Sequence, residues 1–216
     1  MGSSSSQTTP NADIAALAGD AELGDRIGFV VELDRLKHVL RRTVLTDGTR
    51  RENSAEHSWH FAMMALVLAG AADEPVEPLH VARMLLVHDV VEIDAGDTFI
   101  YDTDGRATQA ERERAAADRL FGLLPDGQAD ALRACWLEFE DGTSADARFA
   151  RALDRLQPLL LNYASSGTAW REHGITADRV LAVNAPIGDG SRQLWELAQR
   201  LIGDAVAQGW LPPGDE

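Results

Sequence analysis

The chain has 216 residues, of which 45% are apolar and 25% charged, so its composition is that of a globular protein and excludes a disordered or fibrous one. A formal net charge of −15 repels a nucleic-acid backbone, and we therefore expect no nucleic-acid partner. No apolar run approaches the roughly 20 residues that a membrane span needs. The single cysteine, Cys135, excludes an internal disulfide and is typical of a reducing compartment, so we expect a cytoplasmic protein without a membrane partner.

The first residues, MGSSSSQTTP, lack both the basic start and the apolar segment of a secretory signal. We expect residues 1–20 to form a flexible tail. No change in composition divides the remainder, which predicts a single domain over residues 21–210.

Apolar residues recur at helical intervals through most of this domain. The first apolar stripe consists of Phe29, Leu33, Leu36 and Leu40. A second helix is expected to start near Ser54, where Asn53 or Ser54 can cap it, and to run through Trp59, Met63 and Leu66 to Gly70. Further helical patterns cover residues 79–92, 108–124, 128–139, 144–164, 176–183 and 191–207. No segment alternates apolar and polar residues as a half-buried strand does, so the predicted fold class is all-α.

The dipeptide His88–Asp89 lies in the apolar segment LLVHDVVEIDAGD. A histidine on an apolar stripe is more often a hydrogen-bonded core residue than a ligand. The neighbouring Asp89 changes this balance, because a carboxylate among leucines and valines is costly to bury unless it is paired or bound to a metal ion. The segment therefore indicates a metal site. The acidic and aromatic stretch that follows, residues 96–105, is either a lid over that site or an ordinary surface connection.

Two other segments carry candidate ligands. His57 and His60 lie three residues apart in RRENSAEHSWHFAMM, without the HExxH spacing of zinc proteases, and we expect only one of them to be a ligand. Asp154 lies between apolar residues in FARALDRLQPLLLNY. Its alternative role is a solvent-facing salt bridge with Arg151 or Arg155.

The order His57, His88–Asp89, Asp154 resembles that of the HD-domain superfamily of metal-dependent phosphohydrolases. The segments RENSAEHSWH and LLVHDVVEIDAGD resemble those of the YfbR-like 5′-deoxynucleotidases, and the likeness covers about residues 30–165. It implies an HD-domain helical bundle, a homodimer, and a metal ion bound by these four residues. Two imidazoles and two carboxylates suit Mn²⁺, Co²⁺, Fe²⁺ or Zn²⁺. No histidine occurs between His88 and Asp154, which favours one divalent metal ion over two.

Two acidic residues follow the HD pair. Glu92 lies one helical turn after His88, so its carboxylate is expected near the ion and its water; the alternative is an exposed acid near a helix end. By the resemblance, Glu92 and Asp97 are the catalytic residues, and Asp97 contacts the sugar or helps to move a proton.

An anionic substrate needs local cations in so acidic a protein. The densest basic cluster consists of Arg41, Arg42, Arg50 and Arg51. We expect the last three to bind phosphate, because a guanidinium group can donate paired hydrogen bonds to a phosphate group. The resemblance singles out Arg42. The related nucleotidases commonly have Trp at the next position, where it packs on the sugar, whereas this chain has Thr43, so the preference for deoxyribose over ribose stays open.

The predicted function is metal-dependent hydrolysis of a phosphate monoester, a (deoxy)nucleoside 5′-monophosphate, to nucleoside and phosphate. One alternative is a non-catalytic, nucleotide-binding regulatory protein, although such a protein has little need of Glu92 and Asp97. The other is an HD-fold enzyme of specialised metabolism that acts on a different small phosphorylated substrate.

Overall fold

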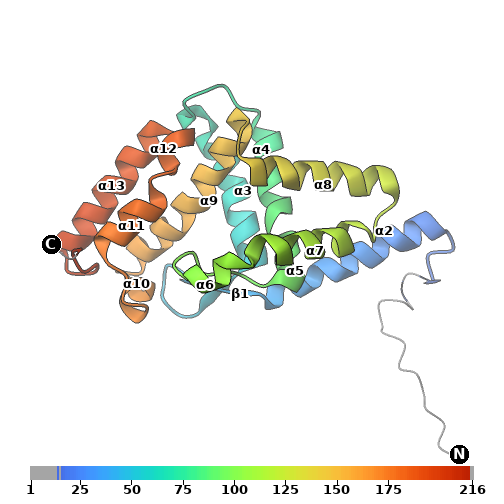
Figure 1. Cartoon of the computed structure of the whole chain (residues 1–216), viewed down its shortest axis with the longest axis horizontal. Helices are drawn as coiled ribbons and strands as arrows, with labels where there is room; N and C mark the ends of the chain where they lie inside the picture. The colour runs from blue at the N-terminus through green and yellow to red at the C-terminus, as the bar shows by residue number, and fades with distance from the viewer. Residues whose placement is uncertain (1–13, 15, 215–216) are drawn as a thin grey trace, which may run out of the picture.

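The computed structural model describes residue 14 and residues 16–214, so most of the expected N-terminal tail lies outside the described residues. The described chain is mainly helical, as predicted (Figure 1). Its main helices are α2 (Ala21–Glu32), α3 (Ser54–Leu68), α4 (Pro78–Val87), α5 (Glu92–Ala95), α6 (Thr103–Ala107), α7 (Gln109–Phe121), α8 (Asp126–Asp141), α9 (Ala145–Ala164), α10 (Thr168–Glu172), α11 (Ala177–Asn184), α12 (Ile187–Gly190) and α13 (Arg192–Ala207). Short 3₁₀ helices are η1 (Leu33–His38), η2 (Ala69–Ala71) and η3 (His88–Val91), and the strands are β1 (Leu40–Val44) and β2 (Arg51–Asn53).

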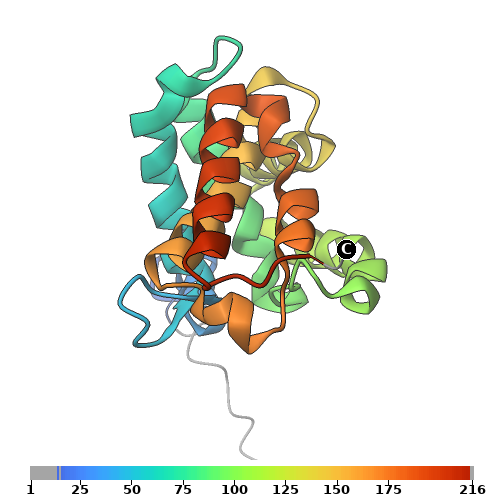
Figure 2. The same cartoon turned by 90° about the vertical axis from the view of Figure 1, so that its left-hand side faces the viewer.

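Helices α3, α4 and α9 pack against one another at the centre of the molecule (Figure 1). α7 and α8 lie on one side of these three helices, and α11, α12 and α13 lie on the other. Seen from the second side, α13 and α11 lie next to each other in front of α9 (Figure 2). Phe61, Leu85 and Leu153 are fully buried between the central helices, and Cys135 on α8 is buried, as expected. In the described residues, no helix has both the length and the apolar character needed to cross a membrane.

The predicted cap of α3 is present. Asn53 Oδ1 accepts a hydrogen bond from the Glu56 backbone N–H at 3.0 Å, and Glu56 Oε2 accepts one from the Asn53 N–H at 3.2 Å. The helix runs through Trp59, Met63 and Leu66 as expected, but these residues do not form its buried face: Trp59 is 64% exposed, and Met63 and Leu66 are also exposed. The buried face instead carries Ser54, His57, Ser58, Phe61 and Ala65. Polar residues on the inward side of a helix indicate a functional site there.

The expected first helical stripe was only partly correct. α2 gives way to the 3₁₀ helix η1 after Glu32, and Leu40 lies in β1, where it is 55% exposed. β1 pairs with β2 in antiparallel register, with Leu40 opposite Asn53 and Val44 opposite Arg51. The connecting turn contains Asp47 and Gly48, and Gly48 has a φ of +69°, in the left-handed region that favours glycine. Strands of five and three residues are too short to give a clear alternating pattern.

The helix predicted over residues 79–92 changes from an α-helix to a 3₁₀ helix before its end. α4 ends at Val87, and the next four residues form η3, in which successive side chains are about 120° apart. Gly96, with a φ of +74°, ends α5. His88, Asp89 and Glu92 are 7%, 5% and 8% exposed, so this change of helix form occurs where three polar side chains are buried.

Candidate metal and active site

The four candidate ligands come from three segments and converge. His57 on α3 places its Nε2 atom 3.3 Å from Oδ1 of Asp154 on α9. His88 on η3 places its Nε2 atom 2.8 Å from Oδ1 of Asp89 and 3.8 Å from Oδ1 of Asp154. Donor atoms held about 2.1 Å from one ion lie about 3.0–3.4 Å from one another in tetrahedral or octahedral geometry. The separation of 3.3 Å lies in this range, whereas those of 2.8 and 3.8 Å lie just outside it. Among the described residues, the group whose possible ligand atoms all lie within 4.8 Å of one another is a different one, His80, Glu138 and Asp146.

The second nitrogen of each imidazole is also held. His57 Nδ1 lies 3.2 Å from Glu52 Oε2, and His88 Nδ1 lies 3.2 Å from the backbone oxygen of Leu85. Since a carboxylate and a carbonyl accept hydrogen bonds, each Nδ1 is a donor, and each Nε2 is the ring atom directed at the carboxylates. This arrangement is typical of metal-binding histidines. Glu52 was not predicted; its signal was an acid directly before the capping segment of His57.

Glu52 is expected to strengthen metal binding without contacting the ion. Both of its oxygens accept N–H groups, since Gln157 Nε2 donates to Oε1 at 2.6 Å. In Glu52→Gln, the new amide must direct its NH₂ group at one of these donors, so His57 loses its fixed orientation. We expect metal affinity, measured by calorimetry, to fall about 10–100-fold. Glu138→Gln, which changes a carboxylate bonded to the partly exposed His80, is the matched control and should leave affinity unchanged.

The charges of the four candidate ligands stabilise one another. Burial alone would lower the pKa of His88, but the carboxylates of Asp89 and Asp154 raise it well above its ordinary value. Removal from water would raise the pKa of Asp154, whereas hydrogen bonds from His57 and His88 hold it well below its usual range. Asp154 is thus an anion in contact with both imidazoles, and its alternative role as a partner of Arg151 or Arg155 was wrong: no ion pair joins them among the described residues.

Glu92 lies beside this group and is buried. The hydroxyl of Ser54 donates to Glu92 Oε2 at 2.5 Å, which fixes the carboxyl group. Burial, followed by the nearby charges of Asp89 and Asp97, raises the pKa of Glu92 well above its ordinary value. Burial and the charge of Asp89 also raise the pKa of Asp97. The expectation of an exposed acid near a helix end does not hold for Glu92.

Arg41 is the cation at the centre of these acids. Its Nη1 atom lies 3.3 Å from Asp89 Oδ2, 3.5 Å from Glu92 Oε1 and 3.5 Å from Asp97 Oδ1. Although burial opposes its charge, the three carboxylates raise the pKa of Arg41. The sequence placed Arg41 in a basic cluster but did not identify this role, because the hairpin that carries it was not predicted.

Some of the residues predicted to bind the substrate line the cavity, and others do not. Arg42 and Thr43 line the cavity next to the candidate metal site. Arg50 does not: its guanidinium pairs with Glu56 at 2.6 Å and is half exposed. Arg51, on the short strand β2, is also absent from the cavity wall. Of the three arginines predicted to bind phosphate, Arg42 lines the cavity, whereas Arg50 and Arg51 do not.

The cavity has a volume of about 390 Å³. Its wall includes His88, Asp89 and Asp154, which places the candidate metal site at its surface. Phe99 and Tyr101, from the loop after α5, form part of the wall, and Arg179 on α11 lies 5.3 Å from the Tyr101 ring centroid. The acidic, aromatic loop thus covers part of the cavity and contacts the C-terminal helices. Further cationic and aromatic wall residues, which the sequence did not reveal, are Arg106, Arg151, Arg155 and Trp170.

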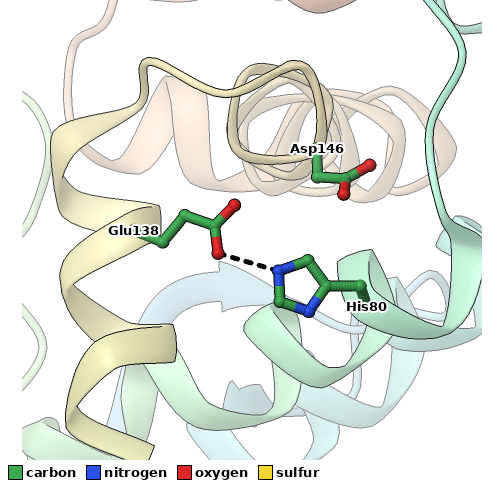
Figure 3. A group of neighbouring side chains, drawn as sticks. All are labelled: His80, Glu138 and Asp146. Carbon is green, nitrogen blue, oxygen red and sulfur yellow. Dashed lines mark hydrogen bonds and ion pairs between the residues drawn. The ribbon is translucent and has the colours of Figure 1, made fainter. Parts of the chain in front are cut away.

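A separate group of possible metal ligands lies between α4, α8 and the start of α9 (Figure 3). It consists of His80, Glu138 and Asp146, all partly exposed. His80 Nε2 and Glu138 Oε2 are 2.7 Å apart, and the backbone N–H of Glu77 donates to Asp146. None of the three residues was a predicted ligand and none lines the cavity. The group thus supplies control positions for the candidate site.

The fold and the convergent histidines and aspartates define a class. A family model described as "HD domain" matches residues 33–195, and the chain therefore belongs to the HD-domain family. The resemblance inferred from the sequence is confirmed.

Comparisons with individual proteins are more specific than the match to the family. The chain is 55% identical to a solved structure described as a predicted metal-dependent phosphohydrolase from Magnetospirillum magnetotacticum MS-1, with a TM-score of 0.85 over 89% of this chain and 96% of that one. It is 32% identical over 133 residues to the 5′-deoxynucleotidase HDDC2 of Bos taurus, which is 61% of this chain and 63% of that protein. It is 30% identical to the Homo sapiens 5′-deoxynucleotidase HDDC2, over 61% of this chain and 64% of that protein. The chain thus spans less than two thirds of the length of these two curated relatives.

Proposed function

We propose that this protein is a metal-dependent phosphomonoesterase that converts a (deoxy)nucleoside 5′-monophosphate to nucleoside and inorganic phosphate. The observation that carries the proposal is the convergence of His57, His88, Asp89 and Asp154 at a cavity whose wall also holds Glu92 and Asp97. Membership of the HD-domain family and the similarity to a metal-dependent phosphohydrolase support a divalent metal ion, and the similarity to 5′-deoxynucleotidases supports a nucleotide substrate.

The four converging residues would hold one ion, Mn²⁺, Co²⁺, Fe²⁺ or Zn²⁺, through two nitrogen and two oxygen donors. Such an ion supplies positive charge to the phosphate and lowers the pKa of water. The hydrogen bonds at the far side of both imidazoles favour this use, because they fix each Nε2 as the ligand atom.

The chain's own acids and bases would complete the reaction. Glu92, held by Ser54, orients a water molecule and takes its proton while the water oxygen forms a bond to phosphorus. The bond between phosphorus and the 5′ oxygen breaks, and Asp97, whose pKa is raised by burial, would pass a proton to the leaving oxygen. Arg41 offsets the charge of the acids, so that an anionic substrate can approach them.

Arg42 is proposed to contact the phosphoryl oxygens. It lines the cavity, and among the described residues no carboxylate lies within ion-pair distance of it, unlike Arg50. Its guanidinium is therefore free to donate to an anion. Thr43, buried next to it, would contact the sugar. A homodimer and a cytoplasmic location, expected from the resemblance and from the composition, are part of the same proposal.

A screen for phosphate release tests the proposal. The protein, supplied in turn with Mn²⁺, Co²⁺, Fe²⁺ or Zn²⁺, is incubated with nucleoside 5′-monophosphates and, as other phosphate monoesters, with sugar phosphates. We expect phosphate release from nucleoside monophosphates that stops on chelation. Binding of nucleotides without turnover would favour a regulatory protein instead, and turnover of sugar phosphates alone would favour an enzyme with a different substrate.

A further inference from the structure

Two buried amides lie in the wall of the same cavity, away from the metal ligands. Asn162 on α9 and Asn184 on α11 are 7% and 6% exposed. In each, Nδ2 donates at 2.8 Å to the backbone carbonyl four residues earlier on its own helix, that of Pro158 or Val180. Because a carbonyl can only accept a hydrogen bond, this contact fixes which end of each amide is NH₂. The oxygen is the end left for another partner.

These amide oxygens have no donor from the protein. Asn162 Oδ1 is buried and has no hydrogen-bond partner in the described structure. No donor contacts Asn184 Oδ1 among the described residues either. A buried acceptor without a donor, such as Asn162 Oδ1, is costly. Together with Asn184 Oδ1, a second acceptor without a protein donor, it suits a ligand that supplies N–H groups.

The surrounding wall suits a flat ring. Phe99, Tyr101 and Trp170 line the cavity, and the rings of Phe99 and Tyr101 lie 5.2 Å apart at 64° to each other. Aromatic side chains bind nucleobases by stacking. Asn162 also lies eight residues after Asp154 on α9, about 12 Å along a helix axis. That separation is comparable with the distance from the phosphate to the base of an extended nucleotide.

We infer that Asn162 and Asn184 form a base-recognition site that selects nucleobases with an amino group at C6 of a purine or C4 of a pyrimidine, which are adenine and cytosine. Each amide oxygen accepts an amino N–H. Hypoxanthine and uracil carry an oxygen at the corresponding position, which would repel the amide oxygen and leave the buried acceptor unpaired. This inference rests on the proposed phosphatase function and names its preferred substrates.

Matched substrate pairs test the inference. dAMP differs from dIMP, and dCMP from dUMP, by the exchange of an amino group for an oxygen. We expect the wild-type protein to prefer the amino member of each pair by about 10-fold or more in kcat/KM. In Asn162→Leu and Asn184→Leu, the preference should shrink to within about threefold, because the acceptor is lost. Both members of a pair are measured on one variant, so a loss of folded protein cancels in the ratio.

Val183→Ala is the matched control, since Val183 lines the cavity next to Asn184 but carries no polar group. It should keep the wild-type ratio. Equal kcat/KM within both pairs for an active wild-type protein would overturn the inference and leave the phosphatase proposal standing. So would a ratio that survives in both leucine variants. A failure to release phosphate from any of the four nucleotides would overturn both proposals.

Discussion

Replacing Asp89 with asparagine is expected to lower metal-dependent phosphate release by at least about 10²–10³-fold, the loss typical of removing one group that stabilises the transition state. Asp89 is 5% exposed and contacts His88 at 2.8 Å and Arg41 at 3.3 Å. The amide is isosteric but neutral, so it binds a divalent ion weakly and leaves Arg41 with less compensating charge. kcat/KM and the metal content of the purified variant, measured by mass spectrometry, should fall together.

His80→Ala is the control for this variant. His80 pairs with Glu138 at 2.7 Å in the group between α4 and α8, away from the cavity (Figure 3). Its loss should change neither metal content nor turnover by more than about twofold, within the range of ordinary surface substitutions. Wild-type turnover by the Asp89 variant, or a loss of activity in the His80 variant alone, would contradict the proposed ligand set. Circular dichroism establishes that both variants remain helical.

Glu92→Gln is expected to separate chemistry from metal binding. The variant keeps the shape of the side chain, and its amide oxygen can still accept the Ser54 hydroxyl, but it cannot take a proton. We expect kcat to fall by about 10²–10⁴-fold, the usual contribution of a general base, while KM and metal content stay close to wild type. Steady-state kinetics of phosphate release, with the metal content measured on the same sample, distinguish these quantities.

A kcat within a few-fold of wild type would show that Glu92 is not the base. A large loss of bound metal would assign it to the ligands instead. The comparison is informative because Glu92 lies close to the ligand group and its pKa is raised by burial and by the charges of Asp89 and Asp97.

The site was predictable where a residue type conflicted with its surroundings. Asp89 stands within a run of leucines and valines, and a buried carboxylate there requires a compensating charge. The cap of α3 was also predictable, because Asn53 and Glu56 have the local spacing of a capping box. The all-helical class followed from repeated 3.6-residue periodicity, which long helices such as α9 display clearly.

Other features depend on contacts that no local pattern encodes. The hairpin β1–β2 has strands of five and three residues, and it decides that Arg41 faces the acids while Arg50 faces Glu56. Glu52 acts through hydrogen bonds to His57 on α3 and to Gln157 on α9, which is 105 residues away. The orphan oxygen of Asn162 is visible only once the neighbours of that side chain are known.

Anomalous scattering from crystals grown with Mn²⁺ or Co²⁺ tests most directly whether four side chains share one ion. We expect a single strong site in contact with His57 Nε2, His88 Nε2 and the carboxylates of Asp89 and Asp154, each at about 2.0–2.2 Å. An ion bound only between His80, Glu138 and Asp146, or crystals with no ion between the two buried histidines at saturating metal, would contradict the proposed active site.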